Sequence, residues 1–414
     1  MTDADASGST NSLVLSGIGE LVTNDPERSG LLGLVHDAAV AVVDGRIEWV
    51  GASTDLPAAY SGVRSLDLEG RAVLPGFVDA HTHTVFAGDR ANEFSKRMAG
   101  AGYAELLAAG GGIYSTVGAT REASFVDLIG ESMPRLQRMF GAGTTTVEVK
   151  TGYGLDVESE TKMVAAGRAL DMALPIDVIS TLLGGHVVAP EFSGDRGAYV
   201  DLVAGPMLDS LAGEVSFVDV FCDGAAFGIE ETRTIASAAA AKGLPIRLHA
   251  DQLSRTGGAA LAAELGAASA DHLDHATDND LEALADAGTV AVLLPGVSYA
   301  MREPAPDGRR FWDSGVEVAI ATDCNPGTSY IETMQFVISL AVVESNLTAG
   351  EAVWAATAGG ARSLLLDDRG AVVPGMVGDL VAIGAPSHEH LAYRPDGDLV
   401  DLVVKSGQPY GDIR

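Results

Sequence analysis

The middle of the chain alternates short apolar runs with alanine-rich stretches that have the 3.6-residue period of a helix. This pattern is typical of consecutive strand–helix units around a parallel sheet. Eight units over about 290 residues match a closed (β/α)8 TIM-like barrel. The alternative, an open doubly wound sheet, predicts a glycine-rich phosphate loop after the first strand, where the sequence has none. The predicted strands are 77–83, 144–150, 177–183, 217–223, 245–251, 269–273, 290–295 and 317–323.

Both ends of the chain have a different pattern, in which short strand-like runs alternate with turns. Residues 39–53 contain two apolar runs joined by an Asp-Gly dipeptide, which is typical of a two-residue hairpin turn. Residues 371–410 contain similar runs broken by Pro and Gly. We therefore expect the two ends to form one small domain together. The predicted domains are a β-sandwich of residues 1–73 with 365–414, and a barrel of residues 74–364.

Composition limits the partners and the compartment. The formal net charge of −31 repels nucleic-acid phosphates and anionic lipid surfaces, so we expect no nucleic-acid partner. No apolar run reaches the ~18 residues of a membrane span. The first residues also lack the basic and apolar regions of a signal peptide, so we expect a cytoplasmic protein with no membrane partner. Cys222 and Cys324 lie inside apolar runs, which favours free buried thiols over a disulfide.

Polar side chains gather where the predicted strands end. Barrel enzymes carry their reactive side chains at the C-terminal ends of the strands. Five of the nine histidines fall at or just after such ends, which random placement would not produce. The sequence therefore predicts one site at this mouth of the barrel. The candidate residues are His81, His83, Lys150, His186, Asp223, His249, Asp251, His272 and Asp323.

His81 and His83 predict a metal centre. Residues i and i+2 of a strand point to the same face, so both imidazoles would project into the barrel mouth. Imidazole nitrogen is a common ligand of zinc and iron, and such ions need three or four donors. His249 and Asp323, at two other strand ends, supply the third and fourth. The alternative, a strand with two surface histidines, is disfavoured by the apolar run VLPGFVDA before the pair.

The other polar residues have simpler alternatives. His272 is either a satisfied core histidine or, beside a metal, a donor to a reacting oxygen, and we favour the second. Lys150 could bridge two metals if it were carbamylated, but pairing with a carboxylate is the preferred hypothesis. We expect His275 to face solvent. No role is assigned to the terminal histidines His36, His388 and His390.

The motif VLPGFVDAHTH resembles the amidohydrolase superfamily, whose members carry His-x-His on the first barrel strand. Further motifs narrow the resemblance to the imidazolonepropionase family and extend it over nearly the whole chain. The most specific are FAGDR after the histidine pair, the loop AAGGGIYSTV and the motif KTGYG. The others include LLGGHVVAPEF, HADQLS, SADHL and ATDCNPGTS.

The resemblance implies one divalent zinc or iron ion, held by His81, His83, His249 and Asp323, and a small anionic substrate. It implies that Arg90 and Tyr153 bind the substrate carboxylate, which suits the bidentate donors of a guanidinium. The remaining substrate contacts that it implies are Tyr103, His186, Asn325, Gly327 and Thr328.

The implied reaction is hydrolysis of the ring amide of 4-imidazolone-5-propanoate to N-formimino-L-glutamate. In this reaction the metal activates a water, and His272 and the metal stabilise the oxyanion. Gln252 departs from the family, because some members have Glu there as a proposed base. An amide cannot accept a proton, although it can hydrogen-bond a ring nitrogen of the substrate. Proton transfer is therefore assigned to Asp323, with His272 as the alternative.

Two other functions and two properties stay open. A deaminase of the same superfamily, acting on a nucleobase or on formiminoglutamate, would usually need an acidic residue near position 252, so Gln252 argues against it. A non-catalytic metal-binding relative is disfavoured by the intact ligands and by Arg90. The ligand set suits both zinc and iron. A homodimer is expected only by analogy with related barrels.

Overall fold

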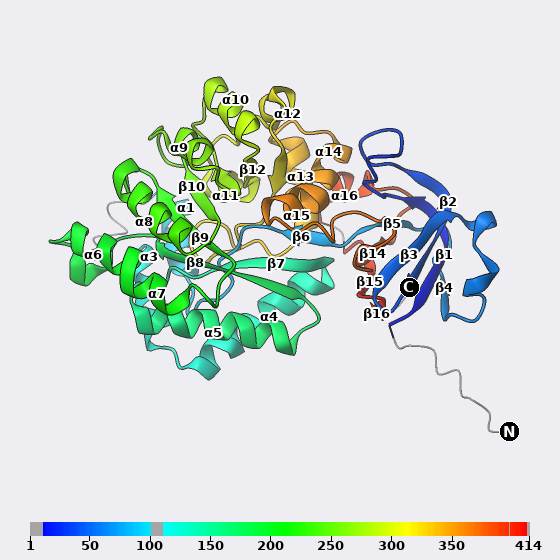
Figure 1. Cartoon of the computed structure of the whole chain (residues 1–414), viewed down its shortest axis with the longest axis horizontal. Coiled ribbons are helices and arrows are strands. Elements are labelled where there is room, and N and C mark those ends of the chain that lie inside the picture. Colours follow the sequence, from blue (N-terminus) through cyan, green and yellow to red (C-terminus); the bar gives the residue numbers. More distant parts are fainter. Residues whose placement is uncertain (1–10, 101–110, 397, 412–414) are drawn as a thin grey trace.

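The computed structural model describes residues 11–100, 111–396 and 398–411. In these residues the chain forms a parallel sheet surrounded by helices and a second, mixed sheet built from both ends of the chain (Figure 1). None of the helices in the described part of the chain is both long enough and apolar enough to span a bilayer. Cys222 and Cys324 are buried and free, as expected.

The parallel sheet confirms the predicted barrel class. Each observed strand lies within its predicted range, except that one runs two residues further, and neighbours pair in parallel in chain order. The strands are β6 (Phe77–Asp79), β7 (Thr144–Lys150), β8 (Asp177–Gly185), β9 (Phe217–Cys222), β10 (Ile246–Ala250), β11 (Ser269–His272), β12 (Val290–Leu293) and β13 (Val318–Ile320).

The first and last strands of this sheet meet beyond their regular ends. The amide of Asp323 donates to the carbonyl of His81, and the amide of His83 donates to the carbonyl of Cys324, both at 3.0 Å. β6 is shorter than predicted, and beyond it Thr82 still contacts β7: its carbonyl accepts the amide of Lys150 at 2.9 Å and its hydroxyl donates to the Glu148 carbonyl at 2.6 Å. The closure brings the histidine pair beside Asp323.

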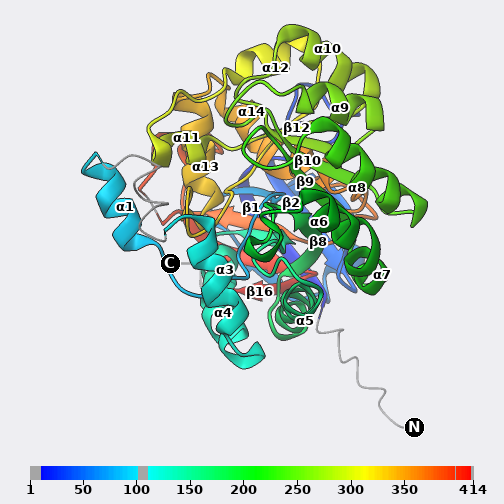
Figure 2. The ribbon, with the colours of Figure 1, turned by 90° about the vertical axis from the view of Figure 1, so that its left-hand side faces the viewer.

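Helices cover the outside of the strands (Figure 2). Their first turns are closed by side chains, as where Ser124 accepts the amide of Asp127 and Asp156 accepts that of Ser159. The helices α8 (Ile229–Ala241), α9 (Gly258–Leu265) and α10 (Asp278–Ala287) follow β9, β10 and β11 in turn. Others on the barrel are α1 (Ala91–Met98), α3 (Ile113–Glu122), α4 (Phe125–Gly141), α5 (Val157–Ala173), α6 (Arg196–Leu202), α7 (Leu208–Leu211), α11 (Pro295–Met301), α12 (Gly308–Ser314), α13 (Met334–Val343), α14 (Ala349–Trp354) and α15 (Gly360–Ser363).

The mixed sheet joins the two ends of the chain. The predicted hairpin is present, with Asp44 and Gly45 at φ of 50° and 82°, as a tight turn between twisted strands requires. A separate apolar cluster lies on this sheet. The predicted domain boundaries stay predictions. The strand order is β16 (Gln408–Tyr410), β15 (Val400–Lys405), β14 (Leu380–Ile383), β5 (Ala72–Pro75), β1 (Leu13–Leu21), β2 (Val35–Val43) and β3 (Arg46–Ala52), with β4 (Ser65–Asp67) also on β1.

An ion cluster fastens the mixed sheet to the start of the barrel strands. Lys405 Nζ at the end of β15 lies 2.7 Å from Asp177 Oδ2 of β8 and 2.6 Å from Asp379 Oδ2. Arg369 pairs with the same Asp177 and donates to Thr146 Oγ1 of β7 at 2.8 Å. This end of the barrel is therefore held to the mixed sheet by charge as well as by chain connection.

Candidate active site

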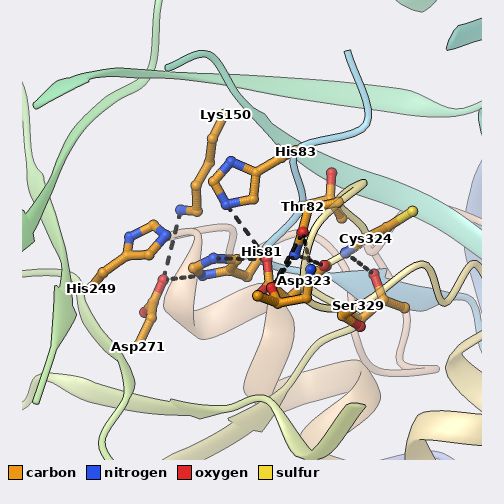
Figure 3. A network of polar contacts seen from close by, with 12 residues as sticks. His81, Thr82, His83, Lys150, His249, Asp271, Asp323, Cys324 and Ser329 are labelled. Carbon is orange, nitrogen blue, oxygen red and sulfur yellow. Dashed lines mark hydrogen bonds and ion pairs between the residues drawn. The ribbon is translucent and has the colours of Figure 1, made fainter. Parts of the chain in front are cut away.

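Five buried side chains meet at the C-terminal mouth of the barrel, and four of them, His81, His83, His249 and Asp323, are labelled in Figure 3. The ligand atoms of His81, His83 and His249 lie within 4.8 Å of one another, and those of His81, His272 and Asp323 do so as well. Each of the five residues is at most 3% exposed. The sequence-predicted pair thus converges with residues more than 160 positions further along the chain.

The distances between these atoms suit ligands of one ion. Asp323 Oδ1 lies 3.4 Å from His83 Nε2 and 3.6 Å from His81 Nε2. Two ligands about 2.1 Å from a tetrahedral ion are roughly 3.4 Å apart. Within the described chain, His81 Nε2, His249 Nε2 and Asp323 Oδ1 are buried without a hydrogen-bond partner. Buried polar atoms almost always have a hydrogen-bond partner. Three neighbouring atoms without one are therefore consistent with ligands of a divalent cation.

Burial sets the protonation of the cluster. It lowers the pKa of His81 well below the usual range, helped by the charge of Lys150, and it does the same for His83 and His272. Neutral imidazole is the form that binds a metal. Burial also raises the pKa of Asp323 to about 7. The cluster therefore favours neutral histidines beside a carboxyl group that titrates near neutrality.

A second layer of charge lies beneath the histidines. His81 Nδ1 donates to Asp271 Oδ2 at 2.6 Å, and His249 Nδ1 lies 3.0 Å from Asp219 Oδ2. Lys150 pairs with carboxylates, as preferred in the sequence analysis: its Nζ lies 2.7 Å from both Glu148 Oε1 and Asp219 Oδ2, and 3.6 Å from Asp271 Oδ2. The sequence analysis did not identify these three acids. Charged residues at alternate positions of otherwise apolar strands were the available signal.

One cavity of about 400 Å³ contains most of the predicted site. Of the predicted residues, His83, Arg90, Tyr153, His186, His249, Gln252, His272, Asp323, Asn325 and Thr328 line it. His81 lies beneath it, and Tyr103 lies outside the described residues. The sequence analysis missed the apolar wall, because hydrophobic positions carry no chemical signature. That wall is Ile113, Val187, Phe221, Ala225, Leu253 and Met301.

Arg90 enters the cavity from the start of α1. Its Nε donates to Glu93 Oε2 at 3.1 Å, and a second pair joins its Nη2 to Glu93 Oε1. The same carboxylate accepts the amide of Gly112 at 2.8 Å. Gly327 lies against Arg90, and a Cβ there would collide with Arg90 Nη1. The absence of a side chain at Gly327 therefore leaves room for the Arg90 guanidinium.

Tyr153 lies on a turn that one buried carboxylate holds, and His186 contacts the same turn. Glu160 of α5 accepts the amides of Gly152, Gly154 and Leu155 at 2.7–3.2 Å, so the turn after β7 wraps around it. His186 Nδ1 lies 3.0 Å from the Gly152 carbonyl, which can only accept, so Nδ1 carries the proton. Burial lowers the pKa of His186 to about 3, so the ring is neutral.

The other strand-end acids organise the backbone. Asp251 accepts the amides of Thr256, Gly257 and Ala259 at 2.6–2.9 Å. Asp223 accepts the amide of Leu253 at 3.0 Å. Both therefore hold the loop that contains Gln252. Outside the barrel mouth, His275 is exposed as expected. His388 bonds Glu20 at 2.8 Å in the terminal region.

Comparison with known proteins places this geometry in a family. The profile of the amidohydrolase family matches residues 72–409. The imidazolonepropionase of Salinispora tropica is 49% identical over 401 residues, covering 96% of this chain and 99% of the relative. The chain belongs to the imidazolonepropionases of the amidohydrolase family. The imidazolonepropionase of Mycolicibacterium smegmatis is 48% identical over 397 residues, covering 96% of this chain and 97% of that protein.

Solved amidohydrolase structures share the fold at low identity. A triazine hydrolase variant has a TM-score of 0.75 at 18% identity, covering 97% of this chain and 95% of that chain. Atrazine chlorohydrolase from Arthrobacter aurescens, complexed with zinc, has a TM-score of 0.72 at 18% identity with the same coverage. These likenesses concern the fold of the imidazolonepropionase chain, not its substrate.

Proposed function

We propose that this protein hydrolyses the ring amide of 4-imidazolone-5-propanoate to N-formimino-L-glutamate. One observation carries the proposal: a guanidinium and a His/Asp metal-type centre line the same cavity of about 400 Å³. The size suits a small ligand, and the two chemistries suit a carboxylate at one end and a hydrolysable amide at the other. The family membership agrees with this assignment.

Arg90 and Tyr153 bind the propionate carboxylate. Glu93 engages Nε and Nη2 of Arg90, so the guanidinium is pre-oriented and its Nη1 lies toward Gly327. On a chain of net charge −31, an anionic substrate needs such a local cation. His186, Gln252, Asn325 and Thr328 supply further polar contacts along the cavity, and the apolar wall lies beside them. Tyr103 and Gly327 are assigned to the substrate site by family resemblance.

His81, His83, His249 and Asp323 hold one divalent ion, zinc or iron. When bound, the ion supplies Lewis acidity toward a water and toward a carbonyl oxygen. Asp323 takes the proton from the attacking water and passes it to the ring nitrogen as the C–N bond breaks. In the metal-free chain burial raises the pKa of Asp323 to about 7, and a bound cation would lower it. The role of Asp323 therefore rests on its position beside the histidine ligands. His272, 2% exposed, faces the reacting oxygen and stabilises its developing charge.

The decisive experiment is an assay of ring opening. Protein loaded with zinc or with iron should abolish the ultraviolet absorbance of the imidazolone, and mass spectrometry should identify N-formimino-L-glutamate as the product. Chelator-stripped protein is the control. Absence of turnover by the metal-loaded protein, or deamination of N-formimino-L-glutamate instead, would overturn the proposal. The cytoplasmic homodimer stays a prediction, and sedimentation of the purified protein tests the dimer.

A further inference from the structure

Lys150 occupies an unusual environment that the proposed reaction does not use. Its side chain has no solvent exposure and ends among three carboxylates, those of Glu148, Asp219 and Asp271. A buried charge is costly unless it is paired. The carboxylates raise the pKa of Lys150 although burial opposes them, so the side chain is a cation. A buried ion cluster stabilises a fold little more than apolar side chains of similar volume would. Stability alone therefore does not account for Lys150.

Two of these carboxylates contact the Nδ1 atoms of candidate metal ligands, His81 and His249. Asp271 Oδ2 accepts from His81 Nδ1 at 2.6 Å (Figure 3), and Asp219 Oδ2 lies 3.0 Å from His249 Nδ1. A carboxylate can only accept, so Asp271 selects the His81 tautomer with the proton on Nδ1 and leaves Nε2 free to bind. Asp219 Oδ2 faces His249 Nδ1 at ion-pair distance without hydrogen-bond geometry. In the described chain, Nε2 of both rings has no hydrogen-bond partner.

Lys150 is the contact that joins these two carboxylates. The same Asp219 and Asp271 oxygens that face the imidazoles are those nearest to its Nζ, at 2.7 and 3.6 Å. Arg247 also donates to Asp271 Oδ2 at 3.2 Å, and its Nε lies 3.8 Å from Glu148 Oε1, but its ion pairs in the described chain do not include Asp219. Lys150 therefore couples the ligand from the first strand to the ligand from the fifth.

We propose that Lys150 is a positioning residue for the metal centre, which orients Asp219 and Asp271 so that both histidines present Nε2 to one ion. The inference rests on the proposed metal centre, but not on the identity of the substrate. The charges agree with it: the three carboxylates and two cations of the cluster leave one negative charge buried next to the site of a divalent cation.

The chain offers a matched control at the other end of the barrel. Lys405 is also largely buried, and its Nζ lies 2.7 and 2.6 Å from Asp177 and Asp379. None of these residues lines the cavity. Lys150→Met and Lys405→Met thus remove the same group from similar ion clusters, of which only one contacts the histidines.

The test measures zinc affinity by chelator competition, together with thermal unfolding of the metal-free proteins. We expect Lys150→Met to weaken zinc binding about 10- to 100-fold. Lys405→Met should change it less than about twofold while lowering the unfolding temperature. Equal affinity of Lys150→Met and wild type, or equal weakening in both variants, would overturn the inference. Failure of the wild type to bind zinc would instead refute the proposed metal centre.

Lys150→Gln keeps the test decisive if Lys150→Met does not fold. Its amide can still donate to a carboxylate but carries no charge. We expect the same direction of change in zinc affinity, and an altered visible spectrum of the cobalt-loaded protein, because that spectrum reports ligand geometry. A purely structural role of Lys150 would leave the spectrum as in wild type, and that result would reject the positioning role.

Discussion

Each end of the barrel has a buried lysine between carboxylates. The two ends differ in the groups that these carboxylates contact besides the lysine. At the C-terminal end, Asp219 and Asp271 continue from Lys150 to two histidines. At the N-terminal end, Asp379 continues from Lys405 to the amide of Ser406. The first cluster leads to atoms that have no partner within the described chain, and the second leads to satisfied backbone.

This difference separates an ion cluster that supports chemistry from one that supports assembly. A lysine–carboxylate pair alone therefore says little about function. The informative property is whether the carboxylates of the cluster also contact side chains that have ligand atoms without a hydrogen-bond partner. Four predictions test this contrast, and their expected effects decrease from the first to the last.

The largest effect is expected at the end of β13. Asp323→Asn keeps an oxygen ligand but cannot take a proton, so kcat should fall by about 10²–10⁴-fold. Steady-state assays combined with metal analysis check this. A near-normal rate with metal bound would remove Asp323 from proton transfer and leave His272 as the remaining candidate.

A smaller effect is expected at the rim of the same mouth. Arg90→Ala removes charge-assisted hydrogen bonds to the carboxylate, worth about 1.5–3 kcal/mol, and should lower kcat/KM by about 10- to 100-fold, mainly through KM. Arg138→Ala is the matched control, since Arg138 makes a similar paired contact with Glu332 on the surface of α4. Turnover insensitive to Arg90→Ala would contradict the carboxylate role.

A several-fold increase in KM is expected from a change at Glu160, beneath the turn that follows β7. Glu160→Gln replaces a carboxylate that accepts three amides by a group with one acceptor oxygen, which costs about 1–2 kcal/mol and loosens the turn carrying Tyr153. We expect a higher KM with unchanged metal content. Loss of metal from this variant would show that metal binding depends on the turn held by Glu160, and would contradict the prediction.

The smallest effect is expected at the N-terminal end. Burial alone would raise the pKa of Asp177, but the charges of Lys405 and Arg369 outweigh it and lower that pKa. The stabilisation is therefore present above about pH 4, the value of the unfolded chain. It is lost as the pH falls through the lower folded pKa.

Asp177→Asn tests this dependence. At pH 7 the variant should be destabilised by less than about 1 kcal/mol, because the side chain is 39% exposed, and its kcat/KM should be unchanged. The difference in unfolding temperature from wild type should shrink below about pH 4. A change in activity at pH 7 would break the contrast between the two ends.

Local patterns in the sequence were enough for the barrel class, the terminal hairpin, and the histidines and Asp323 of the cavity. Short apolar runs and helical runs of period 3.6 depend on near neighbours, so strands such as β7 fall within their predicted limits. His81 and His83 stand at a strand end whose position in a barrel is general. The family resemblance added Arg90 and Tyr153, which no period or spacing marks.

Contacts between distant segments depended on the closed barrel. His81 meets Asp271 across 190 positions, and no local pattern relates the two residues. Lys150 was assigned a carboxylate partner in advance, but which carboxylates it joins follows from inward-facing residues of three strands, β7, β9 and β11, that share one interior. The same applies to Glu160, whose carboxylate is useful only because the turn after β7 folds around it. Periodicity determines which face of a strand is buried, whereas strand order and closure determine which buried groups meet.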